Sequence, residues 1–125
     1  MSLILVADDN ERNRYLTRFL LEQAGHTVHE ANDGSEAVHR VGQERYDLVL
    51  MDIQMPVMDG LEATRKIKAM GAPPTIVALT AQAMQGDRER ILAAGCDGYI
   101  EKPINPRTLT ATNHSFLGGE RSAQL

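Results

Sequence analysis

The chain alternates between short apolar runs and longer amphipathic stretches. Three runs are almost continuously apolar, and they span Leu3 to Ala7, Asp47 to Met51 and Thr75 to Leu79. Strands of a parallel sheet that is covered on both faces have this composition. Two further runs are weaker, because Thr27 to Ala31 alternates polar and apolar residues and Gly98 to Glu101 is short. We therefore expect the first three runs inside a sheet and the other two at its edges.

Numbered along the chain, the first, third and fourth strands would be interior and the second and fifth would be edges. This pattern matches the strand order 2-1-3-4-5, one of the two common doubly wound arrangements. Right-handed crossovers then place helices on both faces of the sheet. The predicted fold class is α/β, a doubly wound five-stranded parallel sheet in a flavodoxin-like three-layer sandwich.

Helical segments are expected to follow the strands. The first has Asn10 as a candidate N-cap and runs to about Gln23. Its inner stripe is predicted to comprise Leu16, Phe19, Leu20 and Gln23. A last helix is expected after Pro106, and residues 118–125 are expected to fray. One domain over residues 1–117 accounts for the whole pattern.

Length and charge exclude some classes of protein. The 125 residues fit one domain of common size. With 13 Lys and Arg against 17 Asp and Glu, the net charge of -4 lacks the positive field of a nucleic-acid binder. Cys96 is the only cysteine, which excludes an internal disulfide. Because the chain shows no secretory signal or long apolar span, we expect a cytoplasmic protein without membrane insertion.

Reactive polar residues follow four of the expected strands. Asp8 and Asp9 follow the first, Asp52 the third, Thr80 the fourth and Lys102 the fifth. The carboxyl ends of parallel strands meet at one edge of a sheet, which is where open α/β sheets bind their ligands. We therefore expect these five side chains to converge.

Three converging carboxylates need a counter-charge. Two carboxylates roughly 5 Å apart repel by about 3 kcal/mol at an effective dielectric near 20. A site made of oxygen ligands suits Mg²⁺, which prefers one or two carboxylates together with phosphate oxygens. Beside such an ion one carboxylate can act as a nucleophile toward a phosphoryl group. Lys102 could then pair with a phosphate oxygen, and Thr80 could donate a hydrogen bond to it.

Four motifs, in order along the chain, resemble those of a bacterial response-regulator receiver domain. The resemblance covers the chain from about Leu3 to Phe116. The motifs are Val6-Ala7-Asp8-Asp9-Asn10, Met51-Asp52-Ile53-Gln54-Met55-Pro56-Val57-Met58-Asp59-Gly60, Leu79-Thr80-Ala81 and Tyr99-Ile100-Glu101-Lys102-Pro103.

The resemblance implies a phosphoacceptor in a two-component or phosphorelay system. It implies that Asp52 accepts phosphate from a histidine kinase or a histidine phosphotransfer protein, and that Thr80 and Lys102 contact the phosphoryl group. Asp8, Asp9 and Asp52 would hold Mg²⁺ together with the backbone carbonyl of Gln54. Such a domain is not an ordinary enzyme, although it assists its own phosphorylation and dephosphorylation.

The resemblance also implies how the signal is read. Thr80 and Tyr99 would form a switch pair, and the face containing Tyr99 would bind an output partner or a second copy of the chain. The Lys102-Pro103 peptide bond would be cis.

Each of these residues also has a simpler interpretation when it is taken alone. Asp9 could cap a helix, Asp52 could form a turn, and Thr80 could merely end a strand. Tyr99 could be a half-buried edge aromatic and Lys102 a solvated charge. The joint order of the motifs favours the site.

Other polar residues carry no predicted chemistry. Arg12, Arg14 and Arg18 are expected to form a solvated helix face, which could also meet a partner. The histidines are scattered and are expected on the surface; they are His26, His29, His39 and His114.

Three other functions are compatible with parts of the pattern. A flavodoxin-like cofactor binder must cradle a phosphate after its first strand, where Asp8-Asp9-Asn10-Glu11 would repel anions. A phosphatase with an aspartate nucleophile would need a second acidic residue two positions after Asp52, where the chain has Gln54. A receiver-like interaction module that is never phosphorylated would not need the full set of site residues.

Overall fold

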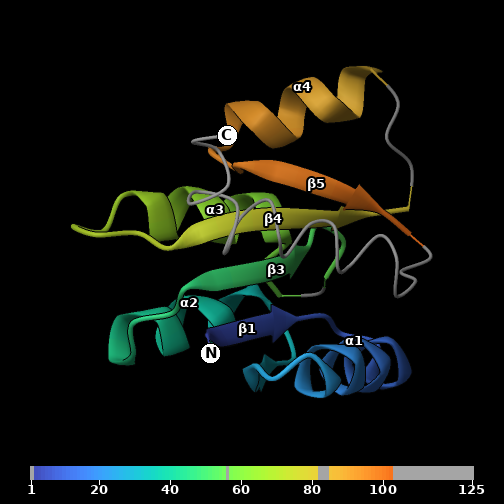
Figure 1. Cartoon of the computed structure of the whole chain (residues 1–125). Coiled ribbons are helices and arrows are strands. Elements are labelled where there is room, and N and C mark those ends of the chain that lie inside the picture. The colour runs from blue at the N-terminus through green and yellow to red at the C-terminus, as the bar shows by residue number, and fades with distance from the viewer. Residues whose placement is uncertain (1, 56, 82–84, 103–125) are drawn as a thin grey trace, which may run out of the picture.

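The computed structural model describes residues 2–55, 57–81 and 85–102. Within them, five parallel strands form one sheet in the order β2-β1-β3-β4-β5, which confirms the predicted order (Figure 1). The strands are β1 (Leu3–Ala7), β2 (Thr27–Ala31), β3 (Leu48–Asp52), β4 (Thr75–Thr80) and β5 (Gly98–Glu101). The helices of the described residues are α1 (Glu11–Gln23), α2 (Gly34–Gln43), α3 (Gly60–Lys68) and α4 (Gln85–Ala93).

The predictions that fall after Lys102 lie outside the described residues. They concern the last helix, the end of the domain at residue 117, the tail over 118–125 and the isomer of the Lys102-Pro103 bond. None of the helices in the described part of the chain is long and apolar enough to cross a membrane.

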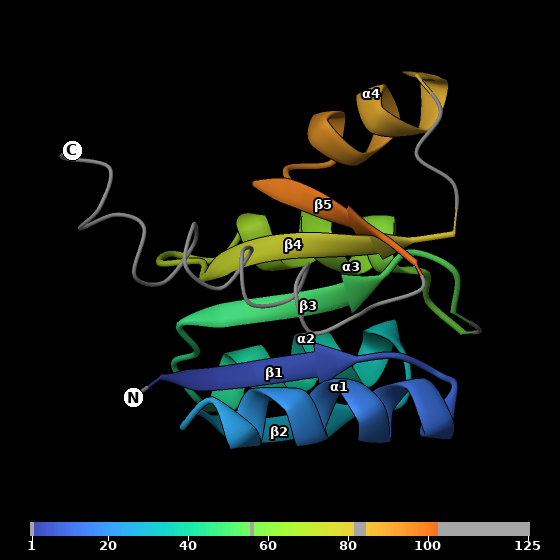
Figure 2. The same cartoon turned by 45° about the vertical axis from the view of Figure 1, so that its right-hand side comes forward.

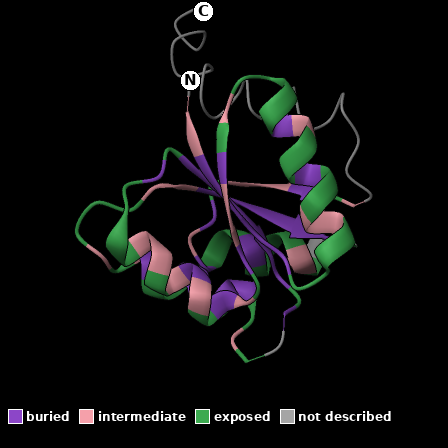
Figure 3. Ribbon diagram, turned by 90° about the horizontal axis from the view of Figure 1, so that it is seen from below, coloured by how far each residue is buried: buried purple, intermediate pink, exposed green. Residues whose placement is uncertain are grey.

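Alternating side chains of the sheet supply two separate cores. One core contains Leu5, Val49 and Ile76 with side chains from α2, α3 and α4. The other contains Ile4, Leu50 and Leu79 with Leu21 of α1. Accordingly, α1 lies on one face of the sheet and α2 and α3 lie on the other (Figure 2). The interior strands β1, β3 and β4 are buried along most of their length, the edge strands β2 and β5 are less buried, and the helices keep exposed outer sides (Figure 3).

The predicted inner stripe of α1 is confirmed only at Leu20, which packs against the core that contains Leu21. Thr17 and Leu21 are the buried residues of this helix, while Leu16 is 43% exposed and Phe19 is 46% exposed. The Phe19 ring instead stacks on Tyr15, with ring centroids 6.4 Å apart. The helix therefore turns toward the sheet a face that contains a threonine, which a purely apolar pattern overlooks.

Side-chain caps fix where the helices begin. Asn10 Oδ1 accepts a hydrogen bond of 2.9 Å from the backbone N–H of Asn13, as predicted for the N-cap of α1. Asp33 and Asp59 cap α2 and α3 in the same way. Because Asn10 is the cap of α1, Asp9 does not serve as one and its carboxylate is left for other contacts.

Two of the histidines that were expected on the surface are more enclosed than predicted. His26 and His29 are half-buried, and His29 Nδ1 lies 2.8 Å from the hydroxyl of Tyr46. His39 is exposed as predicted, and His114 lies outside the described residues.

Candidate functional site

The sheet register brings the predicted polar residues to one edge. Asp52 ends β3 opposite Leu79, and Thr80 ends β4 opposite Glu101. The backbone N–H of Lys102 donates a 2.7 Å hydrogen bond to the carbonyl of Thr80, which continues the pairing of β4 and β5. Asp8 directly follows β1, and β1 pairs with β3, the central strand of the sheet. The convergence expected from parallel strands is therefore confirmed for Asp8, Asp9, Asp52 and Lys102, whose side chains lie together.

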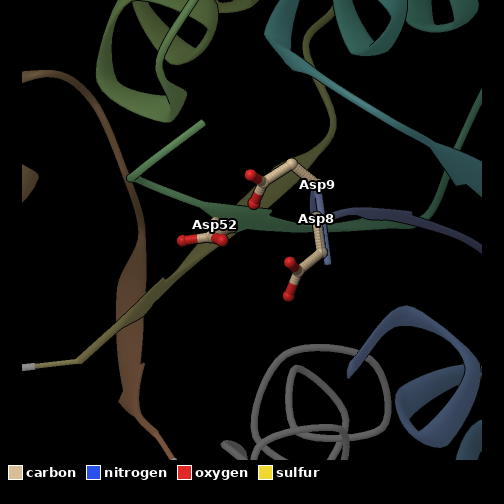
Figure 4. A group of neighbouring side chains, drawn as sticks. All are labelled: Asp8, Asp9 and Asp52. Carbon is tan, nitrogen blue, oxygen red and sulfur yellow. The ribbon is translucent and has the colours of Figure 1, made fainter. Parts of the chain in front are cut away.

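Three carboxylates gather at this edge. One ligand oxygen from each of Asp8, Asp9 and Asp52 lies within 4.8 Å of the others (Figure 4). Asp8 is 1% exposed and Asp52 is 4% exposed, whereas Asp9 is exposed to solvent. Two buried carboxylates and one exposed carboxylate make a small acidic cluster, with Asp9 on its solvent side.

Lys102 supplies a positive charge to the cluster. Its Nζ donates a 3.1 Å hydrogen bond to Asp52 Oδ2 and lies 3.5 Å from Asp8 Oδ2. One ammonium thus serves two buried carboxylates and cannot balance both. The remaining negative charge is available to a cation or to a reacting group.

Asp52 is held by backbone as well as by charge. Its Oδ1 accepts a 3.1 Å hydrogen bond from the backbone N–H of Gln54. Burial raises the pKa of Asp52, and the nearby Asp8 carboxylate adds to that rise, while the bonds from Gln54 and Lys102 oppose it. Asp52 does form a local turn with Gln54, as the simpler interpretation requires, but its burial beside Asp8 and Lys102 exceeds what a turn needs.

The donor set fits a hard divalent cation. Asp8 Oδ2 is buried and accepts no hydrogen bond within the described residues, although a buried carboxylate oxygen normally has a partner. Carboxylate oxygens are the ligands that Mg²⁺ takes, usually together with water. An ion between Asp8, Asp9 and Asp52 would satisfy this oxygen and relieve the repulsion that Lys102 leaves.

Close backbone packing holds the loop after Asp52. A Cβ atom on Gly60 would collide with the carbonyl oxygen of Asp52, so only glycine fits there. The Gly60 N–H donates a 3.2 Å hydrogen bond to the carbonyl of Ile53. In the same loop Val57 has a positive φ of 68° and is 84% exposed. A β-branched residue in this left-handed region is strained.

The expected switch residues lie on β4 and β5. Thr80 is buried at 3% exposure, and Tyr99 is half-buried against the core formed with α2, α3 and α4. Tyr99 pairs with Ala78, two residues before Thr80, so Thr80 and Tyr99 face the same side of the sheet. The guanidinium of Arg88 on α4 lies 5.8 Å from the centre of the Tyr99 ring, a cation–π distance.

The sequence did not predict one contact beside this site, which is made by Arg14. Arg14 was expected on a solvated face, but its side chain is 12% exposed and it reaches both Glu30 on β2 and the backbone carbonyl of Asp8. Arg18 is more open at 45% exposure, which agrees with the expectation. The alternating pattern around Glu30 marked an edge strand but not its partner 16 residues earlier.

Comparison with known proteins identifies a family. The family model for the response regulator receiver domain matches residues 4–113. The polar-differentiation response regulator DivK of Brucella anthropi is 41% identical over 118 residues, which are 92% of this chain and 95% of that protein. The sensor protein GacS of Pseudomonas syringae is 46% identical over 120 residues, but this chain spans only 13% of its length. A hybrid signal transduction histidine kinase of Dictyostelium discoideum is 44% identical, and the chain spans 7% of it.

Solved structures share the fold. The chemotaxis response regulator CheY4 of Vibrio cholerae has a TM-score of 0.89 at 31% identity, over 94% of this chain and 99% of that one. The receiver domain of the sensor histidine kinase PA1611 of Pseudomonas aeruginosa, solved with a magnesium ion coordinated in its active site cleft, has a TM-score of 0.87 at 39% identity, over 94% of this chain and 98% of that one. The receiver domain of Ssk1 of Saccharomyces cerevisiae, solved with the histidine phosphotransfer protein Ypd1, has a TM-score of 0.88 at 30% identity, over 95% of this chain and 90% of that one.

Proposed function

The chain belongs to the response regulator receiver family, and from that premise we propose that it stores a signal as a phosphoryl group on Asp52. The donor would be a histidine kinase or a histidine phosphotransfer protein. Receiver domains of this family act in two-component and phosphorelay signalling, and one similar receiver was solved together with a phosphotransfer protein. The observation that best supports Asp52 is its burial at the end of β3 beside Asp8 and 3.1 Å from Lys102.

Each side chain of the cluster has a role in this proposal. Asp8, Asp9 and Asp52 would bind Mg²⁺, with the backbone carbonyl of Gln54 as a further ligand. The bound ion supplies charge neutralisation of the incoming phosphoryl oxygens. An Asp52 oxygen would form the new bond to phosphorus while the bond between phosphorus and the donor's leaving group breaks. Lys102 would then exchange its contact with Asp52 for one with a phosphoryl oxygen.

The readout would begin at Thr80. A phosphoryl group adds acceptor oxygens to Asp52, and the Thr80 hydroxyl would turn toward them. The Tyr99 ring, on the same side of the sheet, would move into the space that Thr80 leaves. We propose that the face formed by α4 and β5 then binds an output partner or a second copy of the chain.

The proposal also includes the extent and setting of the domain. It takes residues 1–117 as the receiver, places it in the cytoplasm with its donors, and gives it no contact with nucleic acid because its net charge is -4. The domain would assist its own phosphorylation and dephosphorylation rather than turn over a separate substrate.

Labelling with a small phosphodonor tests the central assignment. The protein is incubated with acetyl phosphate and Mg²⁺, and phosphoryl incorporation is measured by intact mass. Wild type should gain one phosphoryl group, and Asp52→Asn should gain none because the nucleophile is lost. Asp59→Asn is the matched control, since Asp59 only caps α3, and it should label as wild type does. Full labelling of Asp52→Asn would overturn the assignment, and an unlabelled wild type would favour an interaction module that is never phosphorylated.

A further inference from the structure

Two arginines on α1 share one carboxylate on β2. Arg14 Nε lies 2.7 Å from Glu30 Oε1, and Arg18 Nη1 lies 2.6 Å from Glu30 Oε2. Their surroundings differ, because the Arg14 side chain is 12% exposed and the Arg18 side chain is 45% exposed. A guanidinium that is largely removed from water is costly unless its N–H groups are bonded, so the partners of Arg14 hold it in one place.

The second partner of Arg14 belongs to the carboxylate cluster. Arg14 Nη1 donates a 2.7 Å hydrogen bond to the backbone carbonyl of Asp8. That carbonyl is part of the peptide that joins Asp8 to Asp9. The peptide is planar, so a bond that fixes its oxygen also fixes the direction in which the chain enters Asp9.

Two other hydrogen bonds hold this turn. The Asp8 N–H donates to the carbonyl of Ala31 at 3.1 Å, and Asp8 Oδ1 accepts from the N–H of Asn10 at 2.9 Å. The second bond closes a turn that spans Asp9, so it also restrains the peptide between Asp8 and Asp9. Arg14 adds a bond to the carbonyl oxygen of that peptide, and Glu30 on β2 keeps Arg14 in position.

We propose that Arg14 is a positioning residue for the Asp8 and Asp9 carboxylates, anchored by Glu30, so that both can bind one Mg²⁺ ion. This inference rests on the proposed function, because the Mg²⁺ site is part of that proposal. It assigns a role in metal binding to a side chain that does not itself touch the ion.

When Arg14 is replaced, the loss of its charge and the loss of its positioning bond should change the Mg²⁺ affinity in opposite directions. A guanidinium repels a cation, so removal of its charge alone would strengthen Mg²⁺ binding. Loss of the bond to the Asp8 carbonyl would weaken it, because the two carboxylates would no longer be held toward one point. Arg18 is a matched control, since it lies on the same helix, contacts the same Glu30 and carries the same charge.

Mg²⁺ titration of the full chain tests the inference without any phosphorylation. Binding is measured by amide chemical shifts at constant ionic strength for wild type, Arg14→Gln, Arg18→Gln and Asp9→Ala. Arg14→Gln should bind Mg²⁺ about tenfold more weakly, the low end of the loss seen when an outer partner of a metal ligand is removed. Arg18→Gln should bind as tightly as wild type or slightly more tightly. Asp9→Ala should lose most binding.

Two outcomes overturn the inference in distinguishable ways. If Arg14→Gln binds Mg²⁺ as Arg18→Gln does while Asp9→Ala does not, the metal site stands and the role of Arg14 is wrong. If wild type binds no more tightly than Asp9→Ala, the proposed metal site itself fails and takes this role with it. Should Arg14→Gln not fold, Arg14→Lys carries the test. It keeps the charge but not the two-pronged geometry, so wild-type affinity in Arg14→Lys would also overturn the inference.

Discussion

Asp52 is a carboxyl group in an unfavourable place for a charge. Burial is the main cause of its raised pKa, and the Asp8 carboxylate adds to it. A carboxyl whose pKa is higher in the folded chain binds its proton more tightly there than in the unfolded chain. Its contribution to stability is therefore present at low pH, below its ordinary value of 3.8, and is lost as the pH rises through the raised pKa.

We predict that Asp52→Asn stabilises the metal-free protein at pH 7 by about 1 kcal/mol, since it removes a penalised charge and keeps the acceptor for Gln54. The difference in the free energy of unfolding between Asp52→Asn and wild type should shrink as the pH is lowered, because Asp52 then becomes protonated in wild type. Urea unfolding in the presence of a chelator at several pH values measures this. Adding Mg²⁺ should stabilise wild type more than Asp52→Asn. A difference that stays constant as the pH falls from 7 to the ordinary value of 3.8 would contradict the electrostatic cause.

The loop between β3 and α3 depends on one close approach of backbones. We predict that Gly60→Ala destabilises the protein by about 2 kcal/mol, because its methyl group would push against the Asp52 carbonyl and shift the loop. Phosphorylation by acetyl phosphate should also slow, since the displaced carbonyl belongs to the phosphoacceptor residue.

Gly42 on α2 is the control for this change. A Cβ there would meet no atom within 4 Å, so Gly42→Ala should stabilise by about 0.5–1 kcal/mol through helix propensity alone. Thermal unfolding of both variants gives the comparison. Equal effects of the same sign would show that the contact at Gly60 can relax.

The elements that the sequence predicted best are those in which burial leaves the least choice of residue type. Strands such as Leu3–Ala7 and Leu48–Asp52 are buried on both faces, so nearly every position must be apolar and the pattern is unambiguous. The face of α1 was predicted correctly only at Leu20, because the apolar residues of that helix, Tyr15, Leu16, Phe19, Leu20 and Leu21, lie on more than one side of it. Its orientation is set by the sheet beneath it, where Thr17 fits and Leu16 does not face inward.

The candidate site was predictable for the residues that end strands. Asp52 and Thr80 follow apolar runs directly, and Lys102 follows the short run Gly98–Glu101. The topology then brings these strand ends to one edge of the sheet. Arg14 was not predictable in this way, because its partners lie on β2 and in the turn after β1 and are joined only in the folded chain. Hydrophobic periodicity describes one helix or strand at a time, so it cannot reveal an ion pair between two of them.

At the scale of the whole molecule, a signal at Asp52 must reach the surface. We predict that Thr80→Ala still accepts a phosphoryl group, more slowly, but fails to move Tyr99. Amide chemical shifts with and without beryllofluoride, which mimics the phosphoryl group, compare the two proteins. In wild type the shifts should extend through β5 and α4, where Arg88 contacts the Tyr99 ring.

In Thr80→Ala the shifts should be confined to the neighbourhood of Asp52. Thr64→Ala, which removes a buried hydroxyl bonded to Gly60 on α3, serves as a control for loss of a threonine elsewhere. Equal shifts around Tyr99 in wild type and Thr80→Ala would refute the coupling between the two residues.

Val57, with its positive φ of 68°, bears on how this protein would evolve in the laboratory. Strain at such a residue is of the order of 1–3 kcal/mol, and glycine, one nucleotide from any valine codon, would relieve most of it. A library selected only for thermal stability should therefore return Val57→Gly early, with an unfolding temperature higher by about 4 °C for each 1 kcal/mol recovered. Retention of valine through such a selection would mean that the loop holds no strain to release.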